Sequence, residues 1–181
     1  AQQQIHFATT IGANIQGSGI NMPGMGLTAG GVYAPTSVLS RLSSQVGSVM
    51  DASIGSRFPI SVGEATSNLQ YGLQSGFFSG TNSLSSFRDK FSSMVQTTRE
   101  VAQAMQISIQ EAHQVMGEMG NLGFGYGTQA PMARAISGTS GITGLGVGQF
   151  ITGAANFSRY GAGGMAMYGG IMNQAALANR M

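Results

Sequence analysis

The sequence predicts a mainly α protein, with extended, non-compact helices and a capped αα-hairpin joined by glycine-rich loops and stabilised by oligomeric assembly. Apolar residues recur every three or four positions in several stretches, which is the spacing of one helix face. Two Ser-x-x-Glu capping boxes mark helix starts. The chain has 29 glycines, only 8% charged residues and a net charge of +2. A free protein with so little charge is expected to be poorly soluble, so we expect it to work inside an assembly or against a membrane.

Residues 1–34 are expected to form an irregular segment, because glycine and proline are too dense there for a long helix or a central strand. A short extended piece is expected around Ile5 to Ile11. Pro35 then stands where a first-turn proline belongs, and a helix is predicted over 36–51. Its apolar face consists of Val38, Leu39, Leu42, Val46, Val49 and Met50.

A second helix is predicted over 61–75, starting at the first capping box, Ser61 with Glu64. Gly72 weakens this helix, and Gly76 ends it. The loop that follows exposes Phe77 and Phe78 unless a neighbour covers them.

The strongest helical pattern lies in residues 83–106, within a helical region predicted over 35–123. After "QIS" the second capping box, Ser108 with Glu111, starts another helix, so the two helices form an αα-hairpin or a tight corner. One apolar stripe runs along the hairpin and comprises Phe87, Phe91, Met94, Val101, Met105, Ile109 and Met116. The chain's 12 methionines are interpreted as core filler rather than as a soft recognition surface.

Residues 124–181 form a Gly/Ala/Met-rich apolar segment in which a helix is expected to open at Pro131. Its glycines recur at helical spacing and would leave a smooth groove for self-packing or membrane contact: Gly138, Gly141, Gly144 and Gly148. The stretch 135–158 is uncharged for about the twenty residues that a membrane span needs, but only marginally apolar. Three interpretations stay open: a conventional span, a segment that inserts only on oligomerisation, and a packed glycine-rich segment.

Composition argues against several functional classes. The eight Lys and Arg residues are scattered, so no basic stripe indicates specific nucleic-acid binding. Cysteine is absent, and His6 and His113 stand alone, so no metal ligands are predicted; His113 is expected on a polar helix face. The carboxylates of Glu64 and Glu111 are explained by capping, and no phosphate-binding loop or other cofactor motif is present. We therefore predict no catalytic, cofactor or metal site and no enzymatic activity.

The first residues lack a basic region followed by a continuous apolar run, so they are not interpreted as a signal peptide. A chain that starts at Ala1 and ends at "LANRM" is expected to be a fragment of a longer protein.

One stretch, "TREVAQAMQISIQEAHQVMGEMGNLGF" at residues 98–124, resembles a pattern seen in phage tail tape measure proteins. In that pattern a helix leads into a small apolar, Ser, x, x, Glu, Ala helix start and ends in Leu or Met, Gly, x, Met, Gly. The matching positions are Met105, Ile107, Ser108, Glu111, Ala112, Met116, Met119 and Gly120. The bias toward Gly, Ala, Ser, Gln and Met with scarce charge is also similar to other ejected virion proteins.

The resemblance implies a structural virion protein that fills the tail tube or tip, helps to set tail length and is ejected to assist DNA passage through the host envelope. Its partners would be copies of itself, on the order of three or six around the tail axis, tail tube or tail tip proteins, and the host membrane. Its location would be the tail lumen or tip and, on infection, the host cell envelope. Alternatives are an internal ejection or tail-tip protein, a secreted glycine-rich pore former and, from a different class, a cell-wall hydrolase domain.

Overall fold

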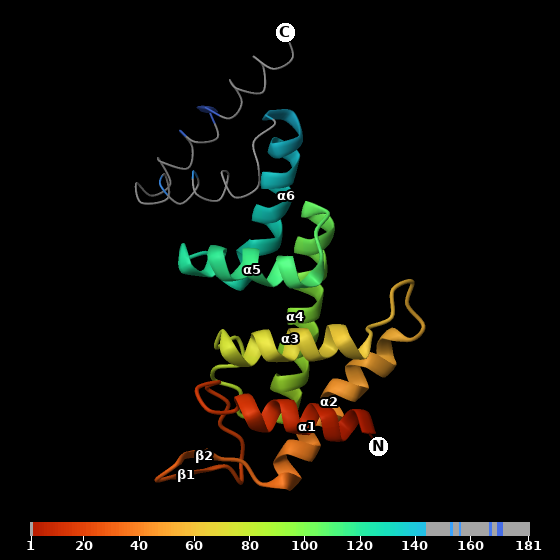
Figure 1. The fold of residues 1–181 in the computed structure, drawn as a ribbon, viewed down its shortest axis with the longest axis vertical. Coiled ribbons are helices and arrows are strands. Elements are labelled where there is room, and N and C mark those ends of the chain that lie inside the picture. Colours follow the sequence, from red (N-terminus) through yellow and green to blue (C-terminus); the bar gives the residue numbers. More distant parts are fainter. Residues whose placement is uncertain (1, 144–152, 154–155, 157–166, 168–169, 172–181) are drawn as a thin grey trace. The chain divides into compact units, whose positions relative to one another are not determined.

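The computed structural model describes residues 2–143, 153, 156, 167, 170 and 171. Within these residues the chain is mainly helical, as the sequence predicts, with a single two-stranded sheet (Figure 1). The elements in order are α1 (Gln2–Asn14), β1 (Gly26–Thr28), β2 (Gly31–Tyr33), α2 (Thr36–Ser53), α3 (Val62–Gln74), α4 (Leu84–Met105), α5 (Ile109–Asn121) and α6 (Tyr126–Thr143). The chain divides into two compact units, Ala1–Gln96 and Thr97–Met181, called unit 1 and unit 2 below.

The division falls inside α4, so the first part of this helix belongs to unit 1 and its last part to unit 2. The predicted limits at 34/35 and 123/124 follow composition, whereas the two units follow contacts between elements. The helices predicted over 36–51, 61–75 and 83–106 are confirmed as α2, α3 and α4, with ends within two residues of the prediction.

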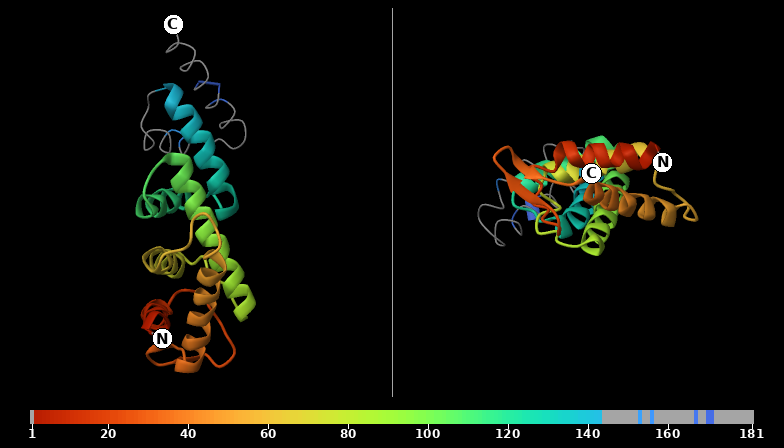
Figure 2. Two further views of the ribbon diagram at one scale, coloured as in Figure 1. Left: turned by 90° about the vertical axis from the view of Figure 1, so that its right-hand side faces the viewer. Right: turned by 90° about the horizontal axis from the view of Figure 1, so that it is seen from below.

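Unit 1 is built around a core of aromatic and aliphatic side chains. In it α1 packs across α2 and beside α3, as Figures 1 and 2 show. The core side chains come from all four helices of the unit and from the loop between α3 and α4, and include Phe7, Ile11, Leu42, Val46, Leu69, Leu73, Phe78, Phe87 and Phe91. Burial of apolar surface is the dominant favourable term in folding, so these side chains stabilise unit 1.

The expectation that residues 1–34 are irregular, with an extended piece at Ile5 to Ile11, is wrong for the first fourteen residues. Gln2–Asn14 is an α-helix in which Phe7 and Ile11, one turn apart, are buried against the rest of unit 1. The helix has no charged residue and a weak apolar periodicity. Its stability therefore comes from packing on α2 and α3 rather than from its own sequence, which is the usual balance in proteins.

The segment after α1 is held to the loop before α4 by backbone hydrogen bonds. The Asn21 N–H donates to the Thr81 carbonyl at 2.8 Å, and the Gly80 N–H donates to the Gly19 carbonyl at 3.0 Å. Gly19 has a φ of 72°, and a Cβ there would lie 2.5 Å from Ser79 Oγ, so only glycine fits. Beyond this contact, β1 and β2 form an antiparallel hairpin in which Leu27 pairs with Val32.

The aromatic pair after α3 is covered within unit 1. Phe78 is fully buried and Phe77 is half-buried. The Phe78 ring lies 5.0 Å from the Phe87 ring and meets the Phe77 ring edge-on at 5.7 Å. The neighbour that the sequence analysis required for these rings is therefore the chain itself.

Unit 2 begins with the corner between α4 and α5, which the sequence predicts correctly. Residues 106–108 join the two helices, and Gln106 adopts a left-handed φ of 56° at the end of α4. The next helix, α6, starts at Tyr126, so the predicted start at Pro131 is wrong. Pro131 lies in the second turn, where the missing N–H removes only one intrahelical hydrogen bond.

Candidate functional site

The apolar stripe of the predicted hairpin is core. Phe87 and Phe91 belong to the core of unit 1, whereas Val101, Met105 and Met116 are buried in unit 2. Met94 is also buried, and Ile109 is half-buried. Apart from the half-buried Ile109, the stripe therefore packs inside the fold.

The glycine row is described only in part. Gly138 and Gly141 lie in α6, so the backbone is helical where the row begins. Gly144 and Gly148, and most of the stretch 135–158, lie outside the described residues. Among the residues that are described, no helix is both long enough and apolar enough to cross a membrane. The self-packing groove stays a prediction.

The second capping box forms in full. Glu111 N–H donates to Ser108 Oγ at 3.2 Å, and Ser108 N–H donates to Glu111 Oε2 at 2.8 Å. The hydrogen bond from the Ser108 backbone lowers the pKa of Glu111, and the hydrogen bond with the Ser108 hydroxyl lowers it further. A carboxyl held ionised at a helix start is a capping group rather than a proton donor for catalysis. At the first box, Ser61 Oγ accepts the Glu64 N–H at 3.1 Å.

His113 does not lie on a polar face, and that expectation is wrong. Its side chain is only 8% exposed, and burial lowers its pKa to about 4. The signal was present in the sequence, because position 113 follows Ile109 by four residues and precedes Met116 by three, on the buried face of α5. Neutral imidazole is tolerated in such a place far better than imidazolium.

Gln129 is a buried polar residue that the sequence analysis missed. Its Nε2 donates to the carbonyls of Met116 at 3.2 Å and Phe124 at 3.3 Å, so it ties α6 to the end of α5. Its Oε1 has no hydrogen-bond partner among the described residues. Leaving one acceptor unsatisfied costs free energy, but Gln129 Nε2 donates two hydrogen bonds, one to a carbonyl within α5 and one to a carbonyl in the loop before α6.

The remaining charged side chains form no metal-binding cluster in the described part of the chain. Arg134 and Glu100 form an ion pair between α6 and α4, at a surface position where such pairs contribute little. No cluster of three His, Cys, Asp or Glu side chains that could hold a metal ion occurs among the described residues.

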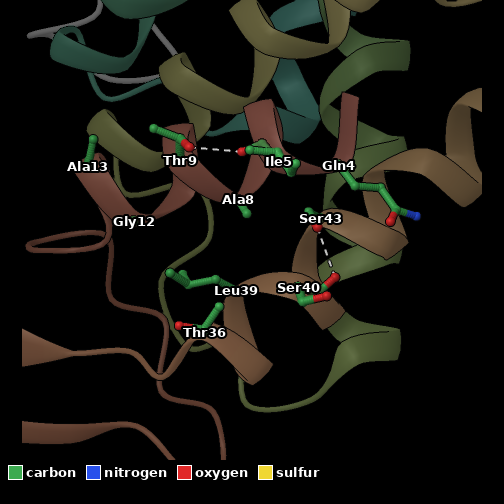
Figure 3. A pocket seen from close by; sticks show the side chains of 10 residues that line it. All are labelled: Gln4, Ile5, Ala8, Thr9, Gly12, Ala13, Thr36, Leu39, Ser40 and Ser43. Atoms are coloured by element: carbon green, nitrogen blue, oxygen red, sulfur yellow. Dashed lines mark hydrogen bonds between the residues drawn. The ribbon is translucent and has the colours of Figure 1, made fainter. Parts of the chain in front are cut away.

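Unit 1 has a groove between α1 and α2, with a volume of about 680 Å³ (Figure 3). The α1 side contributes Ile5, Ala8, Thr9, Gly12 and Ala13, with Gln4 at one end. The α2 side contributes Thr36, Leu39, Ser40 and Ser43. The lining has no titratable side chain, so the groove is suited to packing rather than to acid–base or metal chemistry.

Comparison with known proteins found no matching family model, no similar curated protein and no similar solved structure.

Proposed function

We propose that this chain is a structural virion segment of the tape measure type, which fills the tail tube or tip of a phage, helps to set tail length and is ejected with the genome. In this proposal several copies assemble side by side, and the chain performs no catalysis. The observation that carries the proposal is the capped corner between α4 and α5, in the stretch 98–124 whose sequence resembles tape measure proteins.

Six of the eight positions of that resemblance have a structural role in the corner. Ser108 and Glu111 cap α5, and Ala112, Met116 and Met119 are buried on its inner face. Gly120 lies next to Gln129, since a Cβ there would be 4.0 Å from the amide nitrogen. The resemblance is therefore to the framework of a helical corner, which supports a structural role and carries no active-site residue.

The exposed side chains also support an assembled state. In unit 1, large apolar side chains that include Ile5, Leu27, Ile54 and Phe58 are exposed on a surface that has few charges. Such residues are normal singly, but together with the low net charge they favour contact with neighbours over a freely soluble state. Since unit 1 has a core of its own, neighbours would cover its surface rather than complete its interior.

The glycine-rich stretch 135–158 has a second role in the proposal. Small residues allow close packing between copies in a narrow lumen, and later repacking against the host envelope. Its marginal hydrophobicity would keep it from inserting too early.

The test is the oligomeric state of the 181-residue chain, measured by light scattering after gel filtration, with and without vesicles of phosphatidylethanolamine and phosphatidylglycerol. A closed oligomer of about three or six copies supports a rod on the tail axis. A soluble monomer that ignores lipid contradicts the proposal. Release of vesicle contents by the monomer alone would instead favour a pore former.

A further inference from the structure

One face of α1 is apolar although it lies outside the core of unit 1. The spacing between successive residues of this face alternates between three positions and one, which places them on a single stripe of the helix. The stripe consists of Ile5, Ala8, Thr9, Gly12 and Ala13. The core-facing residues Phe7 and Ile11 lie on another stripe. α1 contains no Asp, Glu, Lys or Arg, so this exposed stripe carries no formal charge.

The groove beside this stripe is shaped by small residues. Gly12 lets α1 approach α2 closely, because a Cβ there would be 3.3 Å from Leu39 Cδ1. Ala8, Ala13 and Ser40 add little bulk on either side. Space is thus left along the two helices for a third helix or for large side chains.

Two of the four hydroxyl side chains that line the groove are already hydrogen-bonded within their own helices. Thr9 Oγ1 donates to the Ile5 carbonyl at 2.9 Å, and Ser43 Oγ donates to the Ser40 carbonyl at 2.8 Å (Figure 3). A hydroxyl that bonds back to its own helix can be covered by an apolar neighbour without losing its donor bond. An apolar neighbour can therefore cover Thr9 and Ser43 at small cost.

Charge indicates what kind of partner fits. None of the lining residues is charged, so a partner that brought a charge into the groove would bury it without a counter-ion. The α1 stripe itself meets the requirement, because it is uncharged and presents Ile5, which is 66% exposed. The outer faces of α2, α4 and α5 carry exposed charged residues such as Arg41, Arg88 and Glu118.

We propose that this groove is a self-association site, in which α1 of a second copy packs against α1 and α2 through the same stripe. The inference rests on the proposed function, since it names the surface through which copies of the chain contact one another. Around a shared axis, equivalent stripes face each other, and Ile5 of each copy fills space beside Ala8 and Gly12 of its neighbour.

The first test is Ile5→Asp in the full chain, with sedimentation equilibrium as the measurement. The substitution places a carboxylate near the start of α1, where it favours the helix of the free chain, but it would bury that charge in the interface. We expect self-association to weaken by about 100-fold. The matched control is Ile54→Asp, which changes an equally exposed side chain outside the groove and is expected to leave association unchanged.

The second test uses the absence of cysteine from the chain. With Ala8→Cys, facing stripes bring two thiols together, so mild oxidation should give a disulfide-linked dimer in high yield. Ala52→Cys, at an exposed position of α2 outside the groove, should give little. Far-UV circular dichroism equal to that of the original chain shows that each variant is folded.

The outcomes separate this inference from the proposed function. If the original chain forms oligomers that Ile5→Asp leaves intact, the groove is not the interface, and the inference is overturned while the assembly proposal stands. If Ile5→Asp keeps the oligomer but removes binding to the phosphatidylethanolamine and phosphatidylglycerol vesicles, the stripe contacts lipid and the inference is again overturned. A chain that is monomeric at all concentrations contradicts both.

Discussion

The two units of this chain stabilise similar helices by different means. Unit 1 is held together by aromatic side chains that pack on one another and closely against the backbone. Phe78 packs on Phe87 and lies against the backbone at Gly72. The described part of unit 2 uses methionines together with buried polar groups and a reciprocal cap, as at His113, Gln129 and Ser108. Unit 1 should therefore be most sensitive to side-chain volume, and unit 2 to protonation and hydrogen bonding.

The largest effect is expected for Phe78→Ala. Removing a fully buried ring leaves a cavity beside Phe87, and such changes cost about 3–5 kcal/mol of unfolding free energy. Urea unfolding followed by circular dichroism measures the loss. Phe58→Ala removes an exposed ring and should change stability by less than about 0.5 kcal/mol. If the two changes reduced the free energy of unfolding equally, the volume of buried side chains would not determine the stability of unit 1.

Gly72→Ala tests the same sensitivity in the opposite direction, by adding volume. A Cβ at position 72 would be 2.5 Å from Phe78 Cε2, so the ring must shift, at a cost of about 1–3 kcal/mol. The control is Gly63→Ala in the same helix, where a Cβ meets nothing within 4 Å and where stability should rise by up to about 1 kcal/mol. A stabilising Gly72→Ala would contradict the packing described here.

In unit 2 we expect a dependence on pH through His113. Its pKa is about 4 in the folded chain and 6.5 as the unperturbed value, so between these limits the unfolded chain binds more protons. The contribution of the neutral imidazole is complete above pH 6.5 and is lost as the pH falls toward 4. Because the shift comes from burial alone, we expect a loss of about 1–2 kcal/mol. His113→Gln should flatten the dependence of the urea unfolding midpoint on pH between about 4 and 6.5. An unchanged slope would mean that other titratable groups cause this dependence.

Local signals in the sequence predicted the parts of the fold that are locally determined. The start of α5 follows from Ser108 and Glu111, which satisfy each other's backbone N–H groups without help from the rest of the chain. In contrast, α1 depends on contacts that Phe7 and Ile11 make with α2 and α3. Pro131 was interpreted as a first-turn residue because proline is common there, whereas the helix begins at Tyr126.

In the candidate site, too, the sequence predicted what local spacing determines and did not predict what depends on tertiary packing. The hairpin stripe was found from spacing, but spacing alone does not distinguish a core face from an interaction face, and Phe87 and Met116 are core. The groove between α1 and α2 was not predicted, because it exists only once residues 4–13 are helical and packed on residues 36–43. Its one sequence signal was the absence of charge from Ala1 to Ser40.

The smallest effect is expected for Ser108→Ala, which removes the hydroxyl that accepts the Glu111 N–H. Loss of such a cap costs about 1 kcal/mol. Ser61→Ala at the start of α3 is the matched change in unit 1, where Ser61 likewise accepts the N–H of a glutamate three residues on. Since the pKa of Glu111 is lowered by its contacts with Ser108, its contribution is present above the ordinary pKa of 4.5 and is lost as the pH falls below it. The Ser108 hydroxyl also donates to Glu111 Oε2, so Ser108→Ala should reduce stability at pH 7 more than at pH 3. A loss that is equal at both pH values would mean that this hydroxyl does not contribute to the lowered pKa of Glu111.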